Sequence, residues 1–380
     1  MIFGLNSINL YLNCNICTNM KIILAIDSFK GCLTSEEVED IIASYLKSKG
    51  IEIHKIPMSD GGEGMLEAFI SAMSGKIVKS IVHDPLMRQI TAQYGITPDG
   101  TAVIETAKAC GLTLMSKEER NPMIATTYGV GELIIHALHA GCRNFIIGLG
   151  GSGTSDAGKG MLKAISDSFP YGRNVKEIID KEMNECRFTL ASDVRNPLCG
   201  NNGAAYIFAP QKGATEEMVI ELDRRAKEFA EASARLIGED KSNEPGAGAA
   251  GGLGYAFLQY FNTTFKSGAD LLLELTDFDS LLNGADMVIT GEGHADSQTL
   301  MGKLPERILR HSQKHNVPVW LIAGRTDDCE KLLSEGFDKV YSITPDDMPT
   351  EEAVKPDNAI ANIKRWTEVH LLPLISKKFD

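Results

Sequence analysis

The stretch that decides the fold is KIILAID (residues 21–27), followed by LTSEEVEDIIASYLKSKG (33–50) and IEIHKIPM (51–58). The first and last of these segments have the apolar runs of buried strands, and the middle one has apolar residues at helical spacing. Thr34 and Glu37 have the spacing of a capping box at the helix start, and Gly50 follows its end. A strand, a helix and a strand in this order predict α/β architecture with a parallel sheet.

The same alternation returns near the end of the chain, in DMVITGEG (286–293), VPVWLIAG (317–324) and KVYSIT (339–344). Between the two ends, residues 76–103 contain short extended runs broken by DP and TPDG, which is typical of antiparallel hairpins. We therefore predict a doubly wound α/β domain made of residues 20–80 and 280–380. A second α/β domain, residues 81–279, is inserted into it, although residues 125–168 could pack with the first domain instead.

Composition and charge exclude several classes of function. The chain has 380 residues, with 38 Lys and Arg against 51 Asp and Glu, and its net charge of −13 disfavours nucleic acid as a partner. No apolar run approaches the roughly 18 residues of a membrane span. The eight cysteines are too sparse for a disulfide scaffold and fit a reducing compartment. We expect a cytoplasmic globular protein without membrane or nucleic-acid partners, and a homodimer is compatible with these features.

Residues 1–19 are predicted to be an unstructured leader or a mis-called start. They contain no basic residue and no small-residue cleavage site, so they do not resemble a signal peptide. Cys14 and Cys17 form a lone CxxC, whereas a structural zinc site needs four ligands. Met20 directly precedes the first predicted strand, so translation could equally begin there.

A glycine-rich turn, GLGGSGTSDAGKG (148–160), follows one predicted strand and opens a helix. Glycines allow a ligand to approach the backbone closely, and a helix N-terminus attracts anions. The turn therefore predicts a phosphate-binding site, and the alternative is a tight turn in which Ser or Asp caps the helix. The candidate phosphate-binding residues are Gly150, Gly151, Ser152, Gly153, Thr154 and Asp156.

This turn also matches the dinucleotide fingerprint GxGxxG at Gly148, Gly150 and Gly153, but no strand ending in an acidic residue follows about 20 residues later. A second match at Gly246 does not follow a strand, and a Walker P-loop is absent. No Ser stands in a GxSxG frame, which disfavours a hydrolase. A nucleotide-dependent hydroxy-acid dehydrogenase therefore remains only an alternative.

Charged groups follow three other predicted strands, in DSFKG (27–31), SDGGEG (59–64) and TGEGHADSQTLMGK (290–303). A single Asp at a strand end is more often a helix cap than a catalyst, but the repetition favours a polar ligand site. Two carboxylates and a lysine beside a phosphate site suggest magnesium. Asp193, in ASDVRNPLCG, could face the same cleft from the inserted domain, and His294 is the one histidine inside a candidate loop.

Seven ordered segments together resemble the bacterial glycerate kinase family of type 1. They are DSFKG, SDGGEG, GGSGTSDAGKGM, SDVRNPLCG, PQKGA, PGAGAAGGLG and TGEGHADSQTLMGK, and the resemblance runs from about Met20 to the last strand. It implies a flavodoxin-like domain with an inserted α/β domain, and phosphorylation of D-glycerate to 2-phosphoglycerate with ATP and Mg²⁺. The family's turn reads nearer GGSATNDGGAGM, so Gly153, Ser155, Ala157 and Lys159 depart from it. A catalytically silent sugar-acid sensor is a second alternative.

The residue types and positions suggest the following roles in such a reaction. Substrate contacts are expected from Asp27, Ser28, Lys30, Gly61, Gly62 and Glu63. Catalytic roles are expected for Lys30, Asp60, Asp193 and Asp296, and magnesium ligands are expected at Asp193, Glu292 and Asp296.

Overall fold

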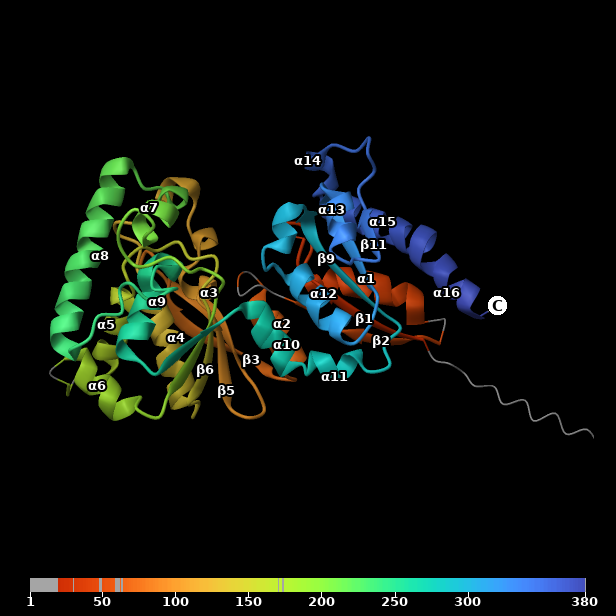
Figure 1. The fold of residues 1–380 in the computed structure, drawn as a ribbon. Helices are drawn as coiled ribbons and strands as arrows, with labels where there is room; N and C mark the ends of the chain where they lie inside the picture. The colour runs from red at the N-terminus through yellow and green to blue at the C-terminus, as the bar shows by residue number, and fades with distance from the viewer. Residues whose placement is uncertain are drawn as a thin grey trace, which may run out of the picture.

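A computed structural model describes residues 20–29, 31–47, 50–58, 62, 64–169, 171–172 and 174–379. The expected leader with Cys14 and Cys17 lies outside the described residues, and so do Lys30, Asp60, Gly61 and Glu63. Figure 1 shows two α/β domains side by side, and the two ends of the chain, red and blue, lie in the same domain.

The first domain contains a five-stranded parallel sheet in the order β11-β10-β9-β1-β2. Numbered within this domain alone, the strands run 2-1-3-4-5, which is the flavodoxin-like order. Ile22 of β1 lies opposite Met287 of β9, so strands from the two ends of the chain are neighbours. The α/β prediction is therefore confirmed. The strands are β1 (Lys21–Ile26), β2 (Glu52–Lys55), β9 (Met287–Ala295), β10 (Val319–Thr326) and β11 (Lys339–Ser342).

Helices cover both faces of this sheet. Successive apolar side chains of β1 point to opposite faces, and each set packs in a different core. Ile22 and Leu24 pack in the core that contains α1 and α15, whereas Ile23 and Ala25 pack in the core on the opposite face, with α10 and α12. Burial on both faces explains the continuous apolar run of β1. The helices of this domain are α1 (Ser35–Leu46), α2 (Met65–Ala72), α10 (Gly268–Leu275), α11 (Phe278–Leu282), α12 (Leu304–Lys314), α13 (Cys329–Ser334), α14 (Thr350–Ala353), α15 (Pro356–Trp366) and α16 (Leu372–Phe379).

The predicted start of α1 is confirmed. The hydroxyl of Thr34 accepts a hydrogen bond from the backbone N–H of Glu37 at 3.2 Å, and the Glu37 carboxylate accepts one from the Thr34 N–H at 2.8 Å. These reciprocal bonds satisfy N–H groups that a helix start would otherwise leave unpaired.

The second domain contains a six-stranded sheet in the order β3-β4-β5-β6-β7-β8. The first three strands pair antiparallel, which confirms the predicted hairpins, and the last four pair in parallel. The strands are β3 (Lys76–His83), β4 (Gln89–Ile96), β5 (Thr101–Glu105), β6 (Asn144–Gly148), β7 (Arg187–Ala191) and β8 (Thr263–Lys266). The helices are α3 (Ala107–Cys110), α4 (Tyr128–His139), α5 (Lys159–Ser168), α6 (Val175–Glu182), α7 (Ala204–Phe208), α8 (Glu216–Ile237) and α9 (Ala249–Tyr260).

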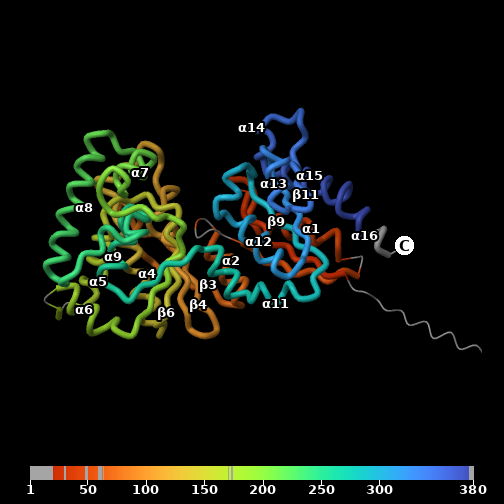
Figure 2. Tube along the Cα trace, viewed as in Figure 1, coloured from red at the N-terminus to blue at the C-terminus, as the bar shows by residue number. Residues whose placement is uncertain are grey.

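Helices α2 and α10 lie between the two sheets, as the tube in Figure 2 also shows. The core around them contains Ile23 of the first sheet together with Val103 and Ile146 of the second. The opposite face of the second sheet is covered by α4, α5 and α9, where Phe145 stacks on Phe188 with ring centroids 4.7 Å apart. An apolar core is therefore shared by both domains.

The sheets suggest domain boundaries that differ from those expected above. Strand β3 begins at Lys76 and belongs to the second sheet, and residues 144–168 also lie in the second domain. Helices α10 and α11 pack against α12 of the first domain. We propose that the first domain comprises residues 20–75 and 268–379, and the second comprises residues 76–267.

Candidate active site

A cavity of about 670 Å³ lies at the carboxyl edge of the first sheet. Asp27 and Ser28 follow β1, Glu292 lies in β9, and Arg325 lies in β10, and all of them line the cavity. Strands β1 and β9 are neighbours where the strand order reverses. Open α/β sheets bind their ligands in the crevice at this switch point.

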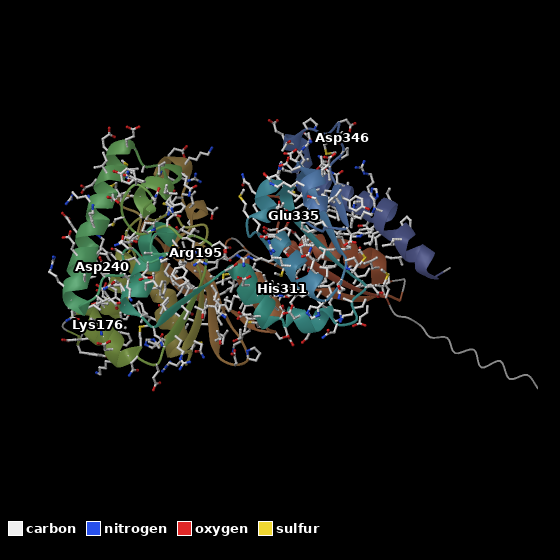
Figure 3. All side chains as sticks on the ribbon, viewed as in Figure 1. Lys176, Arg195, Asp240, His311, Glu335 and Asp346 are labelled. Carbon is white, nitrogen blue, oxygen red and sulfur yellow. The ribbon has the colours of Figure 1, made fainter. Side chains whose placement is uncertain are left out.

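The second domain contributes Asp193 and Arg195, which follow β7 and line the same cavity. Figure 3 labels Arg195, which belongs to the left-hand domain in that view. From α12 of the first domain, Arg307 donates from Nη2 to Oδ1 of Asp193 at 3.3 Å and from Nη1 to Oδ2 of Asp270 at 2.5 Å. The cavity is thus bounded by both domains, and an ion pair joins them at its wall.

The described lining of this cavity has four basic side chains and three acidic ones, and two of the carboxylates are paired with cations. Lys303 Nζ lies 3.2 Å from Oε2 of Glu292, whose Oε1 accepts a hydrogen bond from Thr299 at 2.6 Å. Among the described residues, no carboxylate forms an ion pair with Arg195. The cavity's basic side chains are Arg195, Lys303, Arg307 and Arg325, and its acidic ones are Asp27, Asp193 and Glu292. Such an excess of cations suits an anionic ligand.

Three arginines of this cavity, Arg195, Arg307 and Arg325, were missed by the sequence reasoning. Arg325 stands directly after the strand segment VPVWLIAG, and Arg307 stands one turn into the helix after TGEGHADSQTLMGK. Arg325 donates from Nη2 to the carbonyl of Met348. Its Nε is buried and has no hydrogen-bond partner in the described part of the chain. A search for cations immediately after predicted strands could have found Arg325.

The glycine-rich turn is placed differently from the expectation. None of Gly150, Gly151, Ser152, Gly153 and Thr154 lines the 670 Å³ cavity. Ser152 and Thr154 are buried, and the N–H of Gly153 donates to the carbonyl of Cys110 at 2.8 Å. The middle of the turn is therefore occupied by protein contacts.

A buried lysine holds this turn. Lys212 donates from Nζ to Oγ of Ser152 at 3.0 Å and to the carbonyl of Thr154 at 2.7 Å. Burial lowers the pKa of Lys212 to about 8, because the surroundings disfavour the charged ammonium. Lys212 belongs to the PQKGA segment, for which the sequence suggested no role.

Asp156 caps the start of α5. Its carboxylate accepts hydrogen bonds from the backbone N–H groups of Thr127 at 2.9 Å, Gly158 at 3.0 Å and Gly160 at 3.0 Å. These contacts match the capping alternative for the turn, and Asp156 also lines a second cavity of about 280 Å³, so its expected phosphate contact stays a prediction.

Asp296 also acts as a cap, at the start of the short helix η5 (Ser297–Leu300). Its Oδ1 accepts a hydrogen bond from the N–H of Gln298 at 2.7 Å, and it is not among the residues that line the cavity. Within the described ranges, no three His, Cys, Asp or Glu side chains are grouped to hold a metal. Asp193, Glu292 and Asp296 are therefore not gathered into one three-carboxylate cluster, and their expected roles as magnesium ligands stay predictions.

Fold and site together define the class of this protein. It is a two-domain α/β protein with a cavity lined by arginine, lysine and carboxylate side chains at the switch point of a flavodoxin-like sheet. No helix in the described ranges is long and apolar enough to cross a bilayer.

Comparison with known proteins identifies the family. The model of the glycerate kinase family matches residues 22–370. Glycerate kinase of Bacillus subtilis is 41% identical, with 88% of this chain and 93% of the relative covered, and glycerate 2-kinase of Escherichia coli is 37% identical with the same coverage. A crystal structure from Salmonella typhimurium LT2 that bears the name glycerate kinase 2 superposes with a TM-score of 0.80 at 35% identity, covering 95% of this chain and all of that one. The chain belongs to the glycerate kinase family, as the seven segments predicted.

Proposed function

We propose that this chain transfers the γ-phosphoryl group of ATP to the 2-hydroxyl of D-glycerate, forming 2-phosphoglycerate and ADP. The observation that carries this proposal is the cavity that Arg195 of the second domain lines together with Lys303 and Arg307 of the first. Both substrates are anions, and cations fixed around them can neutralise charge as the phosphoryl group moves. The name of the Escherichia coli relative, glycerate 2-kinase, supports the 2-hydroxyl as acceptor.

The charged end of the cavity, between the domains, is the proposed place for glycerate. Arg195 would pair with its carboxylate, and Ser28 would hydrogen-bond to a hydroxyl. Asp27 is buried at the cavity wall directly after β1, and we assign it the proton of the reacting hydroxyl. The remaining expected contacts, Lys30, Asp60, Gly61, Gly62 and Glu63, stay proposals.

Asp193 fits a magnesium ion better than Glu292 does. Mg²⁺ is commonly held by one or two carboxylates together with substrate phosphates, so a preformed cluster of three is not required. The Asp193 side chain is about half exposed at the cavity, whereas Glu292 is buried against Lys303 and Thr299. When bound, Mg²⁺ would neutralise part of the triphosphate charge.

Cellular location and assembly are further proposals. The described cysteines are all free, which supports a reducing compartment such as the cytoplasm. Strand β3 lies at an edge of the second sheet and exposes Ile81 by 66%, which supports a homodimer through this edge. Light scattering of the purified protein would test the dimer.

One experiment tests the proposed reaction. Purified protein with ATP, Mg²⁺ and D-glycerate should release ADP in a coupled assay, and phosphorus NMR of the product should show a phosphate on the 2-hydroxyl. No release of ADP above the rate without glycerate would refute the kinase assignment. A phosphate on the 3-hydroxyl would refute only the choice of hydroxyl.

A further inference from the structure

The cavity at the first sheet has two chemically different walls. One wall is apolar and consists of Phe29, Ile343, Ala353, Val354 and Ala359. Three of these, Phe29, Ile343 and Ala359, belong to the core that covers the α1 and α15 face of the sheet. The cations Lys303 and Arg307 come instead from the α12 side, where Arg307 also meets the second domain.

The apolar wall offers more apolar surface than a three-carbon acid can use. D-glycerate consists of a carboxylate, two hydroxyls and little apolar surface, so it gains nothing from apolar side chains. Yet Val354 of this wall is 48% exposed, and Met301, which lines the cavity from the segment before α12, is 75% exposed. Exposed apolar side chains in a cavity of about 670 Å³ indicate a larger ligand with an apolar part.

We propose that this wall binds the purine base of ATP, and that the triphosphate runs from there toward Lys303 and Arg307. This inference rests on the proposed function and adds the position of the nucleotide. Asn362 is the only amide side chain among the described residues that line the cavity, and it is 5% exposed. Its Nδ2 donates to Sδ of Met348 at 3.6 Å, and its amide oxygen can accept from an amino group at the polar edge of a base.

The position differs from the one that the glycine-rich turn predicted. Ser152, Gly153 and Thr154 are already engaged by Lys212 and Cys110, and they do not line the cavity. A nucleotide at the switch point instead places its phosphates next to Asp193 and Arg195, where glycerate is proposed to bind. Donor and acceptor then share one cavity, which an in-line transfer needs.

The test uses two opposite charges at one position. Val354→Glu and Val354→Lys both place a charge in the apolar wall, and neither disturbs a fully buried side chain. If the base lies there, each variant should weaken ATP binding about tenfold in calorimetric titration, because a charge would have to be desolvated against the base. Val369→Glu is the matched control, since Val369 is 58% exposed and does not line the cavity, and it should bind ATP like the parent.

Other outcomes would overturn the placement. Stronger ATP binding by Val354→Lys together with weaker binding by Val354→Glu would put the phosphates, not the base, at this wall. Unchanged binding in both variants, with loss of binding in Gly151→Val, would put the nucleotide at the glycine-rich turn. If the parent itself bound no ATP, the proposed kinase function would fail rather than the placement alone.

Discussion

Nη2 of Arg307 on α12 lies 3.3 Å from Oδ1 of Asp193, so a single guanidinium connects the first domain to the loop after β7 of the second. The same guanidinium holds Asp270 at 2.5 Å. Asp193 lines the cavity, whereas Asp270 does not. Arg307 thus has one partner, Asp193, that can contact the substrate, and a second partner, Asp270, that lies within the first domain.

Asp193→Asn should lower kcat about a hundredfold, or about 2.7 kcal/mol in barrier. Asn keeps the size of the side chain and removes the charge that we assign to magnesium. If Asp193 is a metal ligand, raising the magnesium concentration should recover part of the rate. Steady-state kinetics at several magnesium concentrations would measure both effects.

Asp270→Asn is the control for that experiment, because it removes charge from the other partner of the same guanidinium, and Asp270 itself does not line the cavity. Its kcat should stay within about threefold of the parent. An equal loss in both variants would mean that Arg307, and not Asp193, is the group that matters for turnover.

Asp296→Asn should have almost no effect on turnover. Asn caps helix starts as well as Asp does, and Asp296 accepts its bond from Gln298 at the start of η5. We expect kcat within threefold of the parent and only a small change in the free energy of unfolding. A hundredfold loss in a folded variant would restore the catalytic role suggested by the sequence.

Glu39→Gln should change how stability depends on pH. Glu39 is fully buried in α1, and its Oε1 accepts a hydrogen bond from the Ile26 N–H at 3.2 Å. Burial raises the pKa of this carboxyl well above its usual value, so the folded state keeps a proton that the unfolded state has released. Stability of the parent should therefore fall as pH rises above about 4.5, until it passes the raised pKa.

The Gln variant lacks this titration, so the parent should lose stability relative to the variant as the pH rises above about 4.5 in urea denaturation. Glu36→Gln is an exposed change in the same helix, and its curve of stability against pH should run parallel to that of the parent. Parallel curves for Glu39→Gln as well would show that Glu39 is ionised in the folded protein.

Lys212→Met should remove a second dependence of folding stability on pH. Because the pKa of Lys212 is lowered to about 8, the folded parent binds fewer protons than the unfolded chain between about pH 8 and the normal lysine pKa near 10.4. Stability of the parent should rise with pH in this window by roughly 3 kcal/mol relative to the variant. Lys159→Met, an exposed change nearby, should show no such difference when unfolding is followed from pH 7 to pH 10.

Local patterns were enough to predict the first strands and helices. The continuous apolar run of β1 and the capping box of Thr34 and Glu37 depend on neighbouring residues only, and both predictions are confirmed. Strand β8 was missed because TTFK is too short and too polar to stand out.

The functions of the acidic residues could not be predicted in the same way. Asp156, Asp193 and Asp296 all follow strand or turn segments, and only the fold separates two caps from one cavity carboxylate. The partners that decide this are distant in sequence: Arg307 is 114 residues from Asp193, and Lys212 is 60 residues from Ser152.

The neighbouring positions of β1 and β9 affect how the chain can fold during synthesis. The N–H of Lys21 bonds to Asp286, 265 residues later, so β1 has no strand partner on its β9 side until that part of the chain is made. At about 5–20 residues per second, this delay is roughly 13–50 s on the ribosome. The second domain is complete by then, so it can fold first and bring the waiting N-terminal strand close to its late partner. Mutations that slow the folding of the second domain should therefore increase aggregation of the first during translation.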